Sequence, residues 1–314
     1  MSLPKLSLGC SAFGSLFQPV TEEECCAVVE LALSNGIVLL DTAPWYKSSE
    51  EVLGRCLQRL ASSWPRSSYT LNTKVGRYPE GKMFDFSRER VLAGFAQSLQ
   101  RLQTDYVDTI QVHDIEFAQD LGQIVDETLP ALDELRKEGK ARHIGVTGYE
   151  VSTLRELCER SHVKIDKVLS YCRCALHDRS LLESGLLDFL DARGIELINA
   201  SAMGMGLLSH AGPPAWHPAS EELKARAAYA AEHCKSRGVD LSRLALGFCM
   251  RQERVPTTLV SCISVGQMSS NLEVLKVGLS KEEEETLDAV LTEFFPTSTH
   301  WEGVERAALA ASHH

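Results

Sequence analysis

No apolar run in this 314-residue sequence approaches the ~20 residues that a membrane-spanning helix needs. The first ten residues, MSLPKLSLGC, also lack the apolar segment and small-residue cleavage site of a secretory signal. Basic residues are few, because 32 Lys and Arg stand against 43 Asp and Glu, and the formal net charge is −11. Such a charge is typical neither of a nucleic-acid-binding surface nor of a face that binds anionic membranes. We therefore expect a cytoplasmic protein that binds neither nucleic acid nor membrane.

The ten cysteines do not form a metal-binding pattern. Cys25 and Cys26 are adjacent, Cys172 and Cys174 are two apart, and no C-x2-C pair has a second pair or histidines at zinc-ligand spacing. Cysteines in a reducing compartment are commonly small, buried free thiols. The sequence thus predicts free, buried cysteines and no metal site.

The first helical pattern does not open with a G-x-G-x-x-G turn, which argues against an open, doubly wound sheet. Instead, short β-branched or apolar runs alternate with helical patterns such as residues 22–36, 87–103 and 124–140. The strand-like runs are Leu6–Gly9, Ile37–Leu40, Tyr69–Thr73, Val107–Val112, His143–Val146, Lys167–Ser170, Glu196–Ala200 and Thr258–Cys262. Eight alternating units predict an α/β fold, a (β/α)8 TIM barrel in which residues 1–314 form a single domain.

One connection is much longer than the others. It follows the seventh predicted strand at about residues 207–225 and contains the stretch GLLSHAGPPAWHPAS. Its prolines limit its motion, while Trp216 and His217 offer groups for recognition. Because long loops on the catalytic face of a barrel are usually functional, we expect this loop to contact a substrate, with packing on the barrel rim as the alternative. A C-terminal tail is expected from about residue 293.

Three polar residues, Asp41, Lys74 and His113, follow strand-like runs, at the ends where a parallel barrel has its active site. Tyr46 lies five residues after the first of them. A phenol with an unperturbed pKa near ~10 is a poor acid or base at neutral pH. An adjacent ammonium lowers that pKa, and a carboxylate keeps the ammonium charged and in place. With an imidazole to orient a carbonyl or hydroxyl oxygen, the four residues predict a proton-transfer device.

This ordered set resembles the catalytic tetrad of the aldo-keto reductases, and the resemblance runs from about residue 6 to about residue 290. It implies a nicotinamide dinucleotide across the barrel mouth. The segment GVTG follows the fifth predicted strand, and NASAMGMGLL is similar to the family's pyrophosphate-side segment. The resemblance assigns cofactor binding to Gly9, Thr147, Ser170, Tyr171, Ser201, Met203, Gly204, Gly206, Ser261, Gln267 and Asn271.

The adenosine end favours NAD over NADP. In NADPH-using relatives, cationic residues hold the 2′-phosphate, whereas this chain has Ser261 and Gln267 at the matching positions. A 2′-phosphate brings about two negative charges that require Arg or Lys partners. Neutral side chains instead suit a free ribose hydroxyl, although a cation from a neighbouring loop would restore NADP binding.

Longer segments, among them VHDIEF, LSYC and GPPAWHPAS, resemble the plant L-galactose dehydrogenases. The resemblance implies NAD-dependent oxidation of L-galactose at C1 to L-galactono-1,4-lactone, as in ascorbate biosynthesis, by a monomer or weak homodimer. For the sugar we expect Trp45 and Trp216 to pack against its C–H face, and Asp114 and His217 to bind its hydroxyls.

Three alternatives stay open. The first is another aldose 1-dehydrogenase acting on L-fucose or D-arabinose, because one substituent at C5 contributes only ~1–3 kcal/mol of discrimination. The second is an NADPH-dependent aldehyde or carbonyl reductase. The third is a non-enzymatic, redox-sensing barrel, against which the complete tetrad argues.

Overall fold

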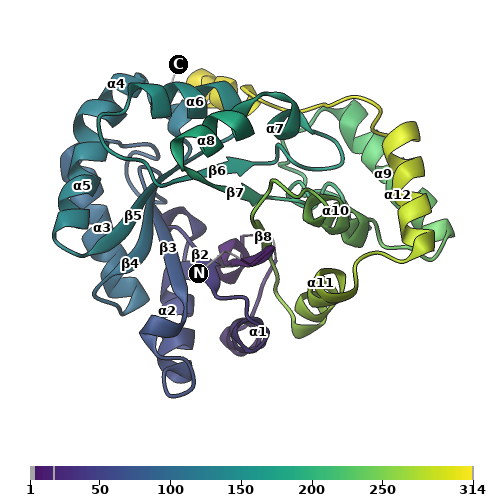
Figure 1. The fold of residues 1–314 in the computed structure, drawn as a ribbon, viewed down its shortest axis with the longest axis horizontal. Coiled ribbons are helices and arrows are strands. Elements are labelled where there is room, and N and C mark those ends of the chain that lie inside the picture. The colour runs from purple at the N-terminus through teal and green to yellow at the C-terminus, as the bar shows by residue number, and fades with distance from the viewer. Residues whose placement is uncertain (1–3, 17, 313–314) are drawn as a thin grey trace.

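A closed barrel of eight parallel strands forms the centre of the protein in the computed structural model, which describes residues 4–16 and 18–312. Neighbours in the barrel follow chain order, and β8 closes the ring against β1 (Figure 1). The strands are β1 (Leu6–Gly9), β2 (Leu39–Asp41), β3 (Thr70–Val75), β4 (Val107–Val112), β5 (Ala141–Gly148), β6 (Lys167–Tyr171), β7 (Glu196–Ala200) and β8 (Thr258–Ser261). The predicted (β/α)8 barrel is confirmed, with strand bounds that differ by no more than a few residues.

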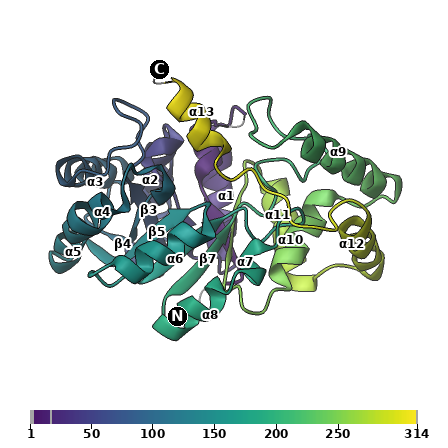
Figure 2. The same cartoon turned by 90° about the horizontal axis from the view of Figure 1, so that it is seen from above.

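The helices form an outer layer around these strands (Figures 1 and 2). They are α1 (Glu22–Ser34), α2 (Ser49–Leu60), α3 (Arg88–Leu102), α4 (Leu121–Gln123), α5 (Leu129–Lys137), α6 (Val151–Arg160), α7 (Ser180–Glu183), α8 (Leu186–Arg193), α9 (Glu221–Ser236), α10 (Leu241–Met250), α11 (Val265–Val277), α12 (Lys281–Glu293) and α13 (Val304–Ser312). Short 3-10 turns include η1 (Ser11–Gly14), η2 (Pro44–Tyr46), η3 (Arg66–Ser68) and η4 (Ile115–Phe117). A π-helical turn, η5 (Ile124–Thr128), joins α4 to α5 just before Pro130, whose missing N–H interrupts the α-helical ladder.

Side chains along each strand alternate between the barrel interior and the helical layer. On β2, Leu39 belongs to a small apolar cluster and Leu40 to the large core between strands and helices. The small cluster, which the alternation places inside the barrel, consists of Leu39, Leu169, Ile198, Ala200 and Leu259. Asp41 lies two residues beyond Leu39, so it points into the barrel at the carboxyl end of β2.

The expectation that all cysteines are free is wrong for one pair. Cys26 of α1 and Cys56 of α2 form a disulfide, whereas the other eight are free. The two partners are 30 residues apart and meet because their helices pack side by side, which spacing along the chain does not reveal. Among the described residues, no group of three or more His, Cys, Asp or Glu could hold a metal ion, and no helix is long and apolar enough to cross a membrane.

The close approach of α2 to α3 depends on Gly54. A Cβ at this position would lie 2.4 Å from the backbone oxygen of Arg101. We expect Gly54→Ala to lower the free energy of unfolding by about 1–3 kcal/mol, because the two helices must move apart. Gly266→Ala is the matched control, since its Cβ would meet only the Ser264 hydroxyl at 3.9 Å. Chemical denaturation checks both variants, and equal stabilities would contradict this account of the packing.

Candidate active site

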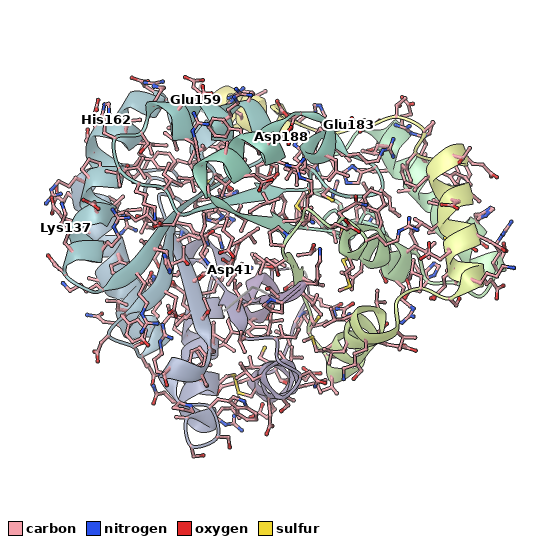
Figure 3. The ribbon with its side chains drawn as sticks, viewed as in Figure 1. Asp41, Lys137, Glu159, His162, Glu183 and Asp188 are labelled. Atoms are coloured by element: carbon pink, nitrogen blue, oxygen red, sulfur yellow. A yellow bond between two sulfur atoms is a disulfide. The ribbon has the colours of Figure 1, made fainter. Side chains whose placement is uncertain are left out.

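Three neighbouring strands bring Asp41, Lys74 and His113 to one end of the barrel interior. Register pairs Asp41 with Asn72, two residues before Lys74, and pairs Val75 with Val112, directly before His113. Lys74 and Asn72 share one side of β3, so the carboxylate and the ammonium both point inward. Figure 3 shows Asp41 near the middle of the molecule, whereas the labelled Lys137, Glu159 and Asp188 lie at its periphery.

The Lys74 ammonium is held by two acceptors inside the barrel, and a third group fixes one of them. It forms a short ion pair with Asp41 Oδ1 and donates to the backbone oxygen of Thr42 at 2.9 Å. Gln111 Nε2 donates to the other carboxylate oxygen of Asp41 at 2.8 Å. Burial alone would lower the pKa of Lys74, but Asp41 and Tyr46 raise it above its usual value. Lys74 is therefore a fixed positive charge at neutral pH.

The backbone around Tyr46 fixes the phenol beside this charge. Tyr46 ends η2, and a Cβ on Gly14 of η1 would lie 1.8 Å from the Tyr46 backbone oxygen, so only glycine permits this approach. The preceding loop is tied to β1 because Thr42 shares a hydrogen bond with Ser49 at 2.8 Å and Ser49 donates to the backbone oxygen of Cys10 at 2.7 Å. The Lys74 ammonium lies 5.0 Å from the centre of the Tyr46 ring.

The pKa directions match a proton-transfer site, with one difference from the expectation. Burial raises the pKa of Tyr46 above its usual value, although Lys74 acts in the opposite direction and lowers it. The sequence predicts a phenol made acidic by Lys74, but the structure shows that desolvation outweighs the ammonium. Burial also lowers the pKa of His113 to about 3, so its ring, edge-on to Tyr46 at 5.7 Å, is neutral at pH 7.

Arg77 is a site residue that sequence reasoning missed. It follows β3, and its guanidinium donates to Asp114 Oδ2 at 2.6 Å while lying 4.3 Å from the centre of the Trp45 ring. The Asp114 carboxylate in turn lies 3.6 Å from His113 Nε2, and Thr147 Oγ1 accepts the Asp114 backbone N–H at 3.0 Å. Arg77 thus joins the predicted residues Trp45 and Asp114.

Tyr171, the last residue of β6, packs against the apolar cluster inside the barrel, whereas Ser170 and Asn199 face the helical layer. Ser170 Oγ and Asn199 Oδ1 are buried and have no hydrogen-bond partner within the described chain. The Asn199 amide donates to the backbone oxygen of Cys174 at 3.5 Å and to Thr258 Oγ1 at 3.2 Å, on the helical side of the strands. Tyr171, beside Ser170, is partly buried and lies edge-on to Tyr149 at 4.9 Å. Of the residues that the sequence assigns to the nicotinamide, Tyr171 is therefore placed to lie beside it, whereas the Ser170 side chain points away from the barrel interior.

The predicted pyrophosphate-side residues lie in the turn that follows β7. Ser201, Gly204 and Gly206 have φ angles of 66°, 54° and 91°, so the chain folds back on itself here. Met203 packs partly buried against the core. Across the barrel mouth, Gly9 is paired with both Asp41 and Ser261 at the strand ends.

At the predicted adenosine end, Ser261 and Gln267 are exposed, whereas Asn271 is buried. Ser261 Oγ accepts the backbone N–H of Ala12 at 3.1 Å, and Gln267 accepts that of Ile263 at 3.0 Å. Asn271 donates to the sulfur of Cys262 at 3.1 Å, which fixes the start of α11. The three residues lie around one end of β8 and α11.

Trp216 and His217, the two residues predicted from the loop after β7 to contact the sugar, differ in their exposure to solvent. Trp216 is 57% exposed, so its indole is accessible, whereas His217 is only 3% exposed. His217 Nε2 bonds the backbone oxygen of Gly204 at 2.9 Å, and Nδ1 accepts the backbone N–H of Ala219 at 3.1 Å. Both ring nitrogens are therefore engaged, and the structure does not support the expected contact of His217 with sugar hydroxyls. Its place is explained by loop packing instead.

Comparisons with known proteins agree with this geometry. The model of the aldo/keto reductase family matches residues 5–292. The chain is 42% identical to the L-galactose dehydrogenase of Arabidopsis thaliana over 298 residues, 93% of this chain and 91% of the relative. It is 35% identical to the D-arabinose 1-dehydrogenase of Saccharomyces cerevisiae over 234 residues, 72% of this chain and 68% of that protein. A holo aldo-keto reductase of Bacillus halodurans superposes with a TM-score of 0.69 at 25% identity, covering 91% of both chains.

We expect Tyr46→Phe to lower kcat for carbonyl reduction by about 10²–10⁴-fold, because it removes the transferable proton. Affinity for the dinucleotide should stay unchanged, since the aromatic ring remains. Steady-state kinetics beside a fluorescence titration with cofactor measures both quantities. A loss of less than about tenfold would exclude Tyr46 as the acid, given the usual size of that role.

Lys74→Met should shift the rising limb of the oxidative pH–rate profile to higher pH, because Lys74 lowers the pKa of Tyr46 and that effect is lost. Asp41 raises the same pKa, so the double variant Lys74→Met with Asp41→Asn should have its limb at lower pH than the single variant. Profiles of all three proteins test this order. A single variant whose profile superimposes on that of the wild type would contradict the coupling.

Proposed function

Because the chain belongs to the aldo-keto reductase family of NAD(P)-dependent oxidoreductases, we propose that it oxidises L-galactose at C1 to L-galactono-1,4-lactone with NAD. The observation that carries this proposal is the row Trp45, Arg77 and Asp114 beside His113. It lines the catalytic end with hydrogen-bonding groups and an aromatic plate, which suit a polyhydroxylated ring. The 42% identity to an L-galactose dehydrogenase supports the same sugar.

In this proposal each member of the tetrad has a separate role. The Tyr46 phenolate accepts the proton of the C1 hydroxyl, and Lys74 stabilises that phenolate. Asp41 keeps Lys74 charged and in place. Neutral His113 donates a hydrogen bond that orients the sugar oxygen. A bound nicotinamide supplies the acceptor for the hydrogen that leaves C1 with its electron pair.

A second candidate, oxidation of D-arabinose, is favoured by the 35% identity to a D-arabinose 1-dehydrogenase. The two sugars share ring-hydroxyl configuration and differ at C5, where a single substituent is worth only ~1–3 kcal/mol. L-fucose belongs to the same group. An NADPH-dependent aldehyde or carbonyl reductase is the other candidate within the family.

The test measures initial rates of oxidation of L-galactose, L-fucose and D-arabinose with NAD and NADP, and of reduction of a simple aldehyde with NADH and NADPH. The highest kcat/KM with L-galactose and NAD is the expected result. A higher kcat/KM with either of the other aldoses would make that aldose the substrate. A higher kcat/KM for the aldehyde with NADPH would make the protein a carbonyl reductase instead of an aldose dehydrogenase.

The remaining parts of the proposal concern the protein as a whole. We propose that residues 1–314 form one domain, in which the loop at about 207–225 lies on the catalytic face and a tail begins at about residue 293. The last two histidines lie outside the described residues. A cytoplasmic monomer or weak homodimer, without nucleic acid or membrane as partner, belongs to the same proposal.

The preference for NAD receives support from the charges near α11. Arg243 of α10 lies 3.4 Å from the Ser270 hydroxyl, but Glu273 and Glu283 pair with its guanidinium at 2.9 and 2.8 Å. Two carboxylates therefore already neutralise this cation. A 2′-phosphate would compete with both of them for the same guanidinium.

The double variant Ser261→Lys with Gln267→Arg should raise kcat/KM for NADP relative to NAD by about tenfold or more, because charge-assisted hydrogen bonds to the phosphate are strong. Ser62→Lys with Ser63→Arg is the matched control. It adds the same charges at exposed positions in the turn before β3, at the opposite end of that strand from the active site. Wild-type protein that already prefers NADP would overturn the assignment.

A further inference from the structure

The C-terminal strap, which we define as residues 295–312, is anchored to the barrel on the catalytic side. Arg179, at the start of α7, donates to the backbone oxygens of Phe295 and Pro296 at 2.9 and 3.1 Å. Trp301 is buried, with its ring 4.8 Å from that of His217 and 5.1 Å from that of His177. These contacts join the strap to the segments after β6 and β7.

Two ion pairs fix the part of the strap that contains α13. Glu302 pairs with Arg173, which follows β6. Arg306 pairs with Glu150, at the start of α6, at 2.9 Å and donates to the backbone oxygen of Glu116 at 3.4 Å. Figure 1 shows the C-terminus close to α6. The register of α13 is therefore set on both sides of Glu305.

Glu305 lies on the catalytic side of the barrel, because its neighbours Glu302 and Arg306 contact Arg173, Glu150 and the Glu116 backbone, which follow β6, β5 and β4. The Arg77 guanidinium after β3 and the Asp114 carboxylate after β4 act on its charge, and the Tyr149 hydroxyl after β5 hydrogen-bonds to it. Cys172 after β6 interacts with the same carboxylate.

The Glu305 carboxylate does not belong to a structural ion pair within the described residues. Arg77 is committed to Asp114 at 2.6 Å, and no cation described by the structure lies within ion-pair distance of Glu305. The side chain is nevertheless partly buried, and burial raises the pKa of Glu305 although Arg77 and Tyr149 lower it. A carboxylate in this position retains acceptor sites for hydroxyl donors.

We infer that Glu305 is a specificity-determining residue: it accepts hydrogen bonds from hydroxyl groups of the substrate, from the strap side of the site, while Asp114 does so from the barrel side. The inference rests on the proposed function in that it names how a polyhydroxylated substrate is recognised. The substrate class it selects is an aldose or hydroxyaldehyde over an aldehyde without hydroxyl groups. The Arg77–Asp114 pair and the Trp45 ring form the facing wall.

Glu305→Gln tests the inference, because it keeps the shape of the side chain and removes its charge. We expect kcat/KM for L-galactose to fall about tenfold to a hundredfold, through KM, since the lost contacts involve a charged acceptor. Reduction of propanal, which has no hydroxyl group, should change by less than about twofold by that same reasoning. Cofactor affinity should be unchanged. Glu293→Gln is the matched control, since this glutamate is exposed near the end of α12.

A purely structural role predicts a different pattern. If Glu305 only anchors the strap through Tyr149, then Tyr149→Phe and Glu305→Gln should both lower the melting temperature and weaken turnover of both substrates equally. That result would overturn the inference. So would an unchanged KM for L-galactose in the Glu305→Gln variant.

Failure of the proposed function is recognised separately. If wild-type protein oxidises no aldose, the proposed function fails, and the comparison is made between reduction of glyceraldehyde and propanal. These two aldehydes differ in the hydroxyl groups that Glu305 would bind. A selective loss for glyceraldehyde upholds the inference about Glu305, and an equal loss for both aldehydes refutes it.

Discussion

The buried ion pair between Lys74 and Asp41 is the interaction on which the active site depends. Both side chains are almost fully excluded from water, so each charge would be costly without the other. Gln111 and the Thr42 backbone oxygen complete the hydrogen bonding of the pair. Breaking such a pair by removing one partner typically costs about 3–5 kcal/mol, because the remaining charge stays buried. The pairing of β2 with β3 and of β3 with β4 brings the members of this cluster together, and the barrel interior excludes water from it.

The barrel and the convergence of the candidate tetrad residues could be predicted because both arise from short-range rules. Strand-like runs alternate with helical patterns, and side chains alternate along each strand, so the residue at a strand end has a defined direction. Asp41 and Lys74 come from two strand ends and His113 directly follows a third, and strict neighbour order around the ring makes them converge. The resemblance to the aldo-keto reductases rests on this same ordered set, which explains why fold and family were both predictable.

What the sequence could not show depends on packing between segments that are distant in the chain. The disulfide joins Cys26 and Cys56 because two helices lie side by side, and no spacing rule anticipates it. Arg77 is an ordinary loop arginine until the structure places it between Asp114 and an aromatic ring. The direction of the Tyr46 pKa was also beyond reach, since it depends on how much desolvation opposes Lys74. The disulfide, the position of Arg77 and the pKa of Tyr46 each depend on distances in the folded protein, which residue types along the chain do not give.

The division between strand ends and later segments also separates chemistry from selectivity. The tetrad is held by backbone register and by the glycine contact behind Tyr46, so its geometry leaves little room for variation. Groups that distinguish one carbonyl compound from another must therefore come from loops and from the strap, which pack on the barrel through side chains. Trp301 of the strap is one example, because its ring contacts the rings of His177 and His217 and so packs the strap against the long loop after β7. Because His217 is bound to the turn at Gly204, movement of the pyrophosphate-side turn would reach the strap through these rings. The turn proposed for the pyrophosphate and the strap proposed for the substrate are thus joined by direct side-chain contacts that do not involve the tetrad.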